Sequence, residues 1–232
     1  MKTHDEYAVT LAIREDSRLI GGTPRDPELI RKWIAAKQLS DKKAAEEITA
    51  MGTPDAQAAL TTEEGAWTGF RTHNEYGRLI GLHIQGRQIA ALIKEAGTLV
   101  GAFMSFRGTR TFLQVGLSVE PRCILLMREG KPLMEPDGRE ESAMHVMGPQ
   151  GPRTCLKRRD YVLSPCELNF RLVIPKKLDG KDILKENKDI EVKTLPELLE
   201  YLLEAGGTSP GLGTDRTQGE GRYKLKSFEK VI

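Results

Sequence analysis

Residues Leu195–Gly206 read LPELLEYLLEAG, and their apolar side chains recur three and four positions apart, which predicts an amphipathic helix. A glycine-rich loop with two arginines follows at Gly211–Arg222, GLGTDRTQGEGR. The alternating segment Tyr223–Phe228 then predicts a strand. Closely spaced glycines let a backbone approach a bulky partner, or adopt a positive φ, without a side-chain clash.

The two arginines of this loop suggest what it contacts. Arg216 and Arg222 can each form paired hydrogen bonds with phosphate oxygens, so the loop indicates contact with an anionic polymer. It is neither a P-loop nor a dinucleotide-binding loop, because it precedes a strand and lacks the GK[ST] signature. The alternative is that its glycines only join a helix to a strand. The candidate backbone contacts are Gly211, Gly213, Gly219 and Gly221.

Composition limits the classes of function. The chain has 232 residues, 39% hydrophobic and 29% charged, as in globular proteins. A net charge of +2 means that nucleic-acid binding has to come from local patches. The three cysteines form no CxxC pair, so we expect no structural zinc, no disulfide framework and no cofactor. No signal peptide or long apolar run is present, and we expect a cytoplasmic protein without membrane contact.

The remaining periodicities predict the element order. Helical spacing is seen at about Asp26–Gly52 and Arg87–Leu99, and Arg128–Arg139 has the composition of an exposed loop. Further strands are expected at Tyr7–Ile13, Phe112–Val119, Cys123–Met127 and Glu167–Ile174. This order predicts an α+β fold with a ferredoxin-like or RRM-like core, an antiparallel sheet with two helices. We expect one domain, 1–232, with a helical insertion at about 23–77 and an extended hairpin or loop insertion at about 103–150.

Basic residues outside the loop form three candidate patches. Gln85 and Arg87 open the predicted helix, where free N–H groups favour phosphate. Arg107 and Arg110 alternate with phenylalanines, a combination suited to stacked bases, although an ordinary strand pair has the same pattern. The third patch follows a Gly-Pro turn and is either a binding surface or a solvated charged face. It comprises Arg153, Lys157, Arg158 and Arg159.

The segment Gly211–Tyr223 resembles the glycine-rich loop of the RAMP superfamily, the RRM-like RNA-binding proteins of CRISPR systems. Three other segments agree in order with that family: Leu19–Gly22, Ile84–Arg87 and Asp160–Glu167. The chain is also similar to uncharacterised phage-encoded proteins with such an ending. The resemblance implies an RRM-like fold, binding of RNA or another single strand, and side-by-side assembly along that strand.

The leading hypothesis is non-catalytic binding of single-stranded RNA or DNA, in a self-associated or multi-subunit assembly. One alternative is a RAMP-like endoribonuclease, in which His73 or His83 moves protons during attack by the 2′-hydroxyl. Metal-dependent cleavage would need carboxylates such as Asp16 and Asp26, although Asp26 is simply explained as a helix N-cap. The other alternative is a phage-encoded protein-interaction or inhibitor subunit, which the small net charge favours.

Overall fold

The computed structural model describes residues 3–24, 67–74, 76–100, 116–148, 151–176 and 192–231. The chain groups into two compact units. The first is drawn from Met1–Ile20, Arg71–Glu135 and Val162–Ile232, and the second from Gly21–Phe70 and Pro136–Tyr161. The expectation of one domain with insertions at about 23–77 and 103–150 stays a prediction.

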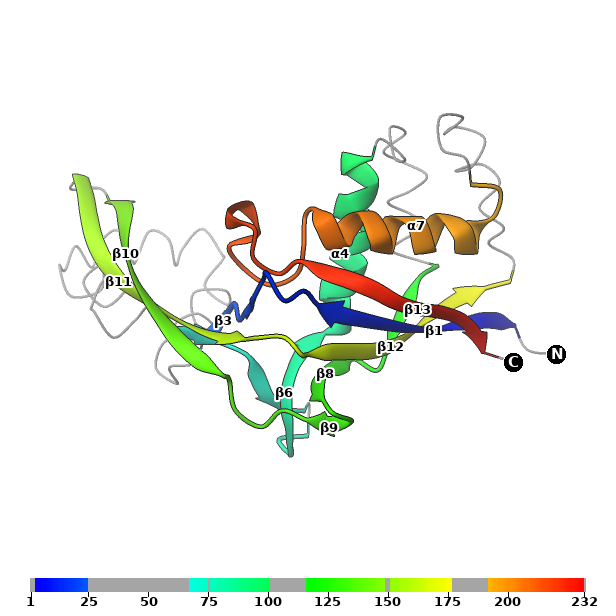
Figure 1. The fold of residues 1–232 in the computed structure, drawn as a ribbon, viewed down its shortest axis with the longest axis horizontal. Helices are drawn as coiled ribbons and strands as arrows, with labels where there is room; N and C mark the ends of the chain where they lie inside the picture. The colour runs from blue at the N-terminus through cyan, green and yellow to red at the C-terminus, as the bar shows by residue number, and fades with distance from the viewer. Residues whose placement is uncertain are drawn as a thin grey trace, which may run out of the picture. The chain divides into compact units, whose positions relative to one another are not determined.

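The first unit is built on an antiparallel sheet that includes the N-terminal strand β1 (His4–Ile13), shown in Figure 1. Every second side chain of this strand is buried, including Val9 and Leu11, because alternate residues of a strand point to the same face. Its neighbours are β13 (Tyr223–Val231) and β12 (Glu167–Pro175). The predicted strands at both ends of the chain are therefore confirmed.

The sheet continues beyond β12 in the order β13-β1-β12-β8-β6-β5. The short strand β7 also pairs with β12, and β9 pairs with β8. These strands are β5 (Arg71–His73), β6 (Leu79–Gln85), β7 (Ser118–Glu120), β8 (Cys123–Arg128) and β9 (Lys131–Pro132). The short strand β2 (Leu19–Ile20), which follows β1 along the chain, does not belong to this sheet.

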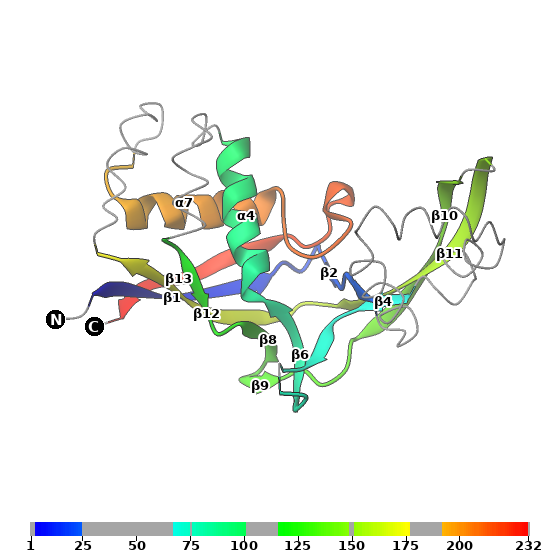
Figure 2. The same cartoon turned by 180° about the vertical axis from the view of Figure 1, so that it is seen from behind.

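Two helices, α4 (Gly86–Leu99) and α7 (Leu195–Thr208), lie on the same side of this sheet in Figure 1 and in the reverse view of Figure 2. Their apolar faces, for example Leu92 and Leu202, are buried. Along the chain the core runs β1, α4, β7 and β8, β12, α7, β13. The last strand pairs with the first, the first with β12, and β12 with β7 and β8. This is the ferredoxin-like arrangement, so the predicted fold class is confirmed.

A long hairpin dominates the second unit. Its strands β10 (Gly138–Gly148) and β11 (Gly151–Val162) pair antiparallel, from Gly138 opposite Tyr161 to Gly148 opposite Gly151. Within the same unit, β11 pairs in parallel with β4 (Trp67–Gly69), which pairs with β3 (Thr23–Pro24). The extended hairpin expected with the fold class is present, and its strand β10 falls within the expected range 103–150.

Parts of the sequence interpretation differ from the structure. The segment Arg128–Arg139 is not one loop, because Glu129 and Gly130, both at positive φ, form a tight hairpin turn between β8 and β9. Strand β6 was not predicted, because four consecutive buried residues hide the alternation that marks a strand with one solvated face. The predicted helix at Asp26–Gly52 lies outside the described residues.

Candidate nucleic-acid interface

A pocket of about 390 Å³ opens where β6 passes into α4. All of its lining residues belong to the first unit. They come from the β5–β6 hairpin, the first turn of α4, and the residues around the turn between β7 and β8. They are Arg71, His73, Asn74, His83, Gln85, Gly86, Arg87, Val119, Arg122 and Cys123.

The junction between β6 and α4 places the predicted pair Gln85 and Arg87 at this pocket. Gln85 is the N-cap of α4, and its N–H donates to Oε1 of Gln88 at 2.8 Å. The N–H of Gly86 donates to the Arg122 carbonyl at 2.8 Å, which ties the helix start to the turn before β8. Arg87 is exposed on the first helical turn.

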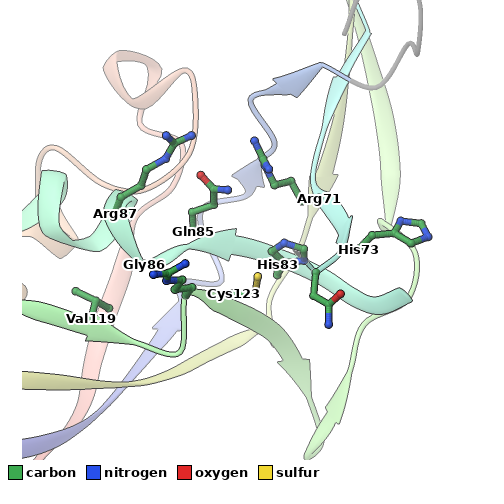
Figure 3. Close-up of a pocket in the computed structure, with 10 residues that line it drawn as sticks. Arg71, His73, His83, Gln85, Gly86, Arg87, Val119 and Cys123 are labelled. Carbon is green, nitrogen blue, oxygen red and sulfur yellow. The ribbon is translucent and has the colours of Figure 1, made fainter. Parts of the chain in front are cut away.

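Strand pairing brings to the pocket two arginines, Arg71 and Arg122, that the sequence analysis did not identify. Arg71 on β5 lies opposite His83 on β6, and Gln85 lies opposite Cys123 on β8. Arg122 directly precedes β8 and is exposed. Figure 3 shows Arg71, Gln85 and Arg87 extending to the same side of β6. Neither Arg71 nor Arg122 belongs to a sequence motif, so only the pairing of β5, β6 and β8 reveals them.

The pocket is strongly cationic. Three arginines and two histidines line it, and none of its ten lining residues is acidic. Guanidinium groups that converge on one hollow favour an anion of phosphate geometry, because each can form two parallel hydrogen bonds with it.

His83 is a buried member of this pocket, and its surroundings favour the uncharged imidazole. Its side chain is almost fully covered, and Nδ1 donates to the Gly81 carbonyl at 3.1 Å. Burial lowers the pKa of the imidazole, and the charges of Arg71 and His73 lower it further, against the opposing effect of the Gly81 hydrogen bond. Because a carbonyl only accepts, Nδ1 carries a proton, and in the neutral ring Nε2 then has the lone pair. His73 is exposed, and its ring points away from His83 in Figure 3.

The glycine-rich loop folds back onto the segment that leaves β1. Thr214 N donates to the Ile20 carbonyl at 3.1 Å, and Gly221 N donates to the Arg18 carbonyl at 2.7 Å. Gly213, at φ 78°, faces the Ile20 carbonyl, and Gly221, at φ 74°, faces another carbonyl of the loop. A side chain at either position would collide with backbone. Packing of the loop on its own chain explains these glycines, and phosphate contact by the loop stays a prediction.

One of the loop arginines pairs with an acidic residue, and the other adds its charge near one. The Arg216 guanidinium donates to the Glu95 carboxylate on α4 at 2.6 Å, and both side chains are partly exposed. Hydrogen bonds from Arg14 lower the pKa of Asp16, and the charge of Arg222 adds to that effect. Neither loop arginine lines the pocket around His83.

The basic cluster after the Gly-Pro turn lies on β11, in the second unit. Arg158 donates to Glu141 at 2.8 Å, and Arg159 donates to Glu140 at 3.1 Å, so each pairs with an acidic residue of β10. The Arg159 side chain is only 6% exposed. Lys157 is half-buried on the same strand.

Several predicted residues are not described. Arg107, Arg110 and Asp26 lie outside the described residues, and only the backbone of Arg153 is described, within β11. In the described part of the chain, no group of three or more histidine, cysteine or acidic side chains could hold a metal ion. Its helices include none that is long and apolar enough to cross a membrane.

No protein-family model and no curated protein matches the sequence. Among solved structures, the chain is similar to one in the cryo-EM structure of the Type III-B Cmr-beta bound to cognate target RNA. The alignment covers 99% of this chain and 61% of that chain, with 10% sequence identity and a TM-score of 0.47. The present chain thus spans less than two thirds of the Cmr chain.

Proposed function

We propose that this protein binds single-stranded nucleic acid without cleaving it, as one subunit of an assembly along the strand. The pocket at the start of α4 carries the proposal, because it gathers three arginines and no carboxylate in a chain whose net charge is only +2. Local concentration of guanidinium groups is what phosphate binding needs when the whole molecule supplies no basic field.

The nucleic-acid strand would bind in the pocket through its phosphate groups. Arg71, Arg87 and Arg122 would contact phosphate oxygens, and Gln85 has an amide that can bond sugar or base. Contact of nucleic acid with the Gly211–Gly221 loop, with Arg216 and Arg222, and with the β11 residues Lys157 and Arg158 remains a separate prediction for each unit. RNA and single-stranded DNA both satisfy these contacts, since the phosphate backbone is common to them.

Charge reversal in the pocket tests this function. Anisotropy of a labelled 20-nucleotide single strand, as RNA and as DNA, measures affinity for the wild type and for Arg71→Glu with Arg87→Glu. We expect a loss of roughly tenfold or more at low salt, because two phosphate contacts become repulsive. Arg87→Glu is compatible with folding, since an acidic residue is favourable in the first turn of a helix.

The matched control reverses two exposed lysines that do not line the pocket, Lys193→Glu with Lys224→Glu, and changes net charge by the same amount. Equal losses in the two double variants would show that only overall charge matters. A wild-type protein that binds neither strand, and co-purifies with no nucleic acid, would move the assignment to a protein-interaction subunit.

One observation favours a second candidate, RNA cleavage. His83 places a neutral imidazole in an arginine-lined pocket, which is the combination of a base and cations that attack by a 2′-hydroxyl requires. Labelled RNA should then be cut by the wild type without added metal, and not by His83→Ala. Intact RNA after incubation with and without divalent metal rejects this candidate.

A further inference from the structure

The tip of the β5–β6 hairpin carries the most exposed large hydrophobic side chain among the described residues. Tyr76 is 85% exposed. The turn beneath it is ordered by Asn74, whose Oδ1 accepts from the N–H of Tyr76 at 3.0 Å and from the N–H of Arg78 at 2.9 Å. Gly77 N donates back to the Asn74 carbonyl at 3.0 Å. The backbone of the turn that carries the Tyr76 ring is therefore fixed by hydrogen bonds to Asn74.

The same hairpin forms one wall of the cationic pocket. Arg71 and His73 lie on β5, and Asn74 itself lines the pocket while it holds the turn of Tyr76. Two residues of chain span at most about 7 Å, so the Tyr76 backbone lies close to the pocket rim. Tyr76 thus sits two positions along the chain from a residue that lines the pocket.

We infer that Tyr76 is a stacking platform for one base of the single strand whose phosphates occupy the pocket, an inference that rests on the proposed function. Single-strand binders combine a basic groove with exposed aromatic rings, and every base offers a π-face to such a ring. A ring carried by a turn whose backbone is already ordered loses little conformational freedom when a base stacks on it. Asn74 acts here as a positioning residue.

Removal of the ring tests the inference directly. The probe is a labelled 20-nucleotide single strand, and the variants are Tyr76→Ala and Tyr76→Phe. Tyr76→Ala should weaken binding about tenfold, as loss of one stacked base does elsewhere, whereas Tyr76→Phe keeps the ring and should bind within about twofold. Tyr201→Ala on α7 is the matched control, since Tyr201 is 39% exposed and does not line the pocket.

An abasic strand separates stacking from charge. It keeps every phosphate and lacks the bases, so Tyr76→Ala and the wild type should bind it equally. In a double-mutant cycle, adding Asn74→Ala to Tyr76→Ala should cost less than Asn74→Ala alone, because Asn74 acts partly through the ring.

Three results overturn the inference, and they are distinguishable. Unchanged affinity of Tyr76→Ala for the base-bearing strand excludes stacking while the proposed function stands. A loss in Tyr76→Phe as large as in Tyr76→Ala assigns the effect to the hydroxyl. Failure of the wild type to bind any strand removes the proposed function and the inference together.

Discussion

At the scale of single residues, His83 shows how burial sets chemical character. The sequence shows only a histidine before the Gln85–Arg87 turn. In the fold the ring is buried, and its Nδ1–H donates a hydrogen bond to the Gly81 carbonyl. The charges of Arg71 and His73 lie nearby. All of the charge effects and the burial disfavour the protonated form. The result is a side chain that favours its neutral form inside an arginine-lined pocket.

This burial predicts an acid sensitivity of the fold. The folded-state pKa of His83 is below its unfolded value, so the unfolded chain takes up the proton first. Stability is therefore full above the unfolded value and falls as the pH drops below it. His83→Asn, which keeps an N–H donor, should lose less free energy of unfolding between pH 7.5 and pH 5.5, as measured by urea denaturation. His4→Asn is the control, because His4 is exposed and should behave as the wild type. Identical pH profiles for wild type and His83→Asn would contradict this account.

At the scale of elements, the glycine-rich loop owes two of its glycines to contacts within the chain. Gly213 and Gly221 combine positive φ with a backbone carbonyl where a Cβ would be. A binding loop and a tightly packed loop thus share one sequence pattern, because both require close backbone approach. The structure shows the packing, and binding by the loop requires its own test.

The loop predicts a stability difference between glycines. Gly213→Ala should lower the free energy of unfolding by about 3 kcal/mol or more, since it adds a clash to an unfavourable φ. Gly130→Ala, also at positive φ but with open space around it, should cost about 1 kcal/mol. Chemical denaturation measures both variants. Equal costs would show that φ alone, and not contact with the Ile20 carbonyl, requires glycine at 213.

At the scale of the whole molecule, the distribution of charge matters more than its sum. Lysine and arginine exceed acidic residues by only two, yet the pocket gathers three arginines without a carboxylate. On β11, Arg158 and Arg159 pair with acidic residues of β10. Long-range attraction to a polyanion should therefore be weak and local contacts decisive.

The salt dependence of binding should reflect this distribution. For single strands the logarithm of affinity falls by roughly 0.7 per phosphate contact for each unit of log salt concentration. Arg87→Gln should therefore reduce the magnitude of the slope by about 0.7, whereas Lys193→Gln should leave it unchanged. Anisotropy titrations between about 50 and 300 mM salt measure both slopes. A wild-type slope near zero would exclude phosphate contact in the pocket.

The sequence by itself determined the α+β class, both helices of the ferredoxin-like core and the strands at each end of the chain, because alternating or helical spacing of apolar residues records which face is buried. It also identified Gln85 and Arg87 at a helix start. Only the tertiary structure decided that Arg71, Asn74 and Arg122 join them, that His83 is buried, and that Arg159 pairs within a hairpin. These facts depend on strand pairing between distant segments, and periodicity within one segment carries no information about which segment lies beside it.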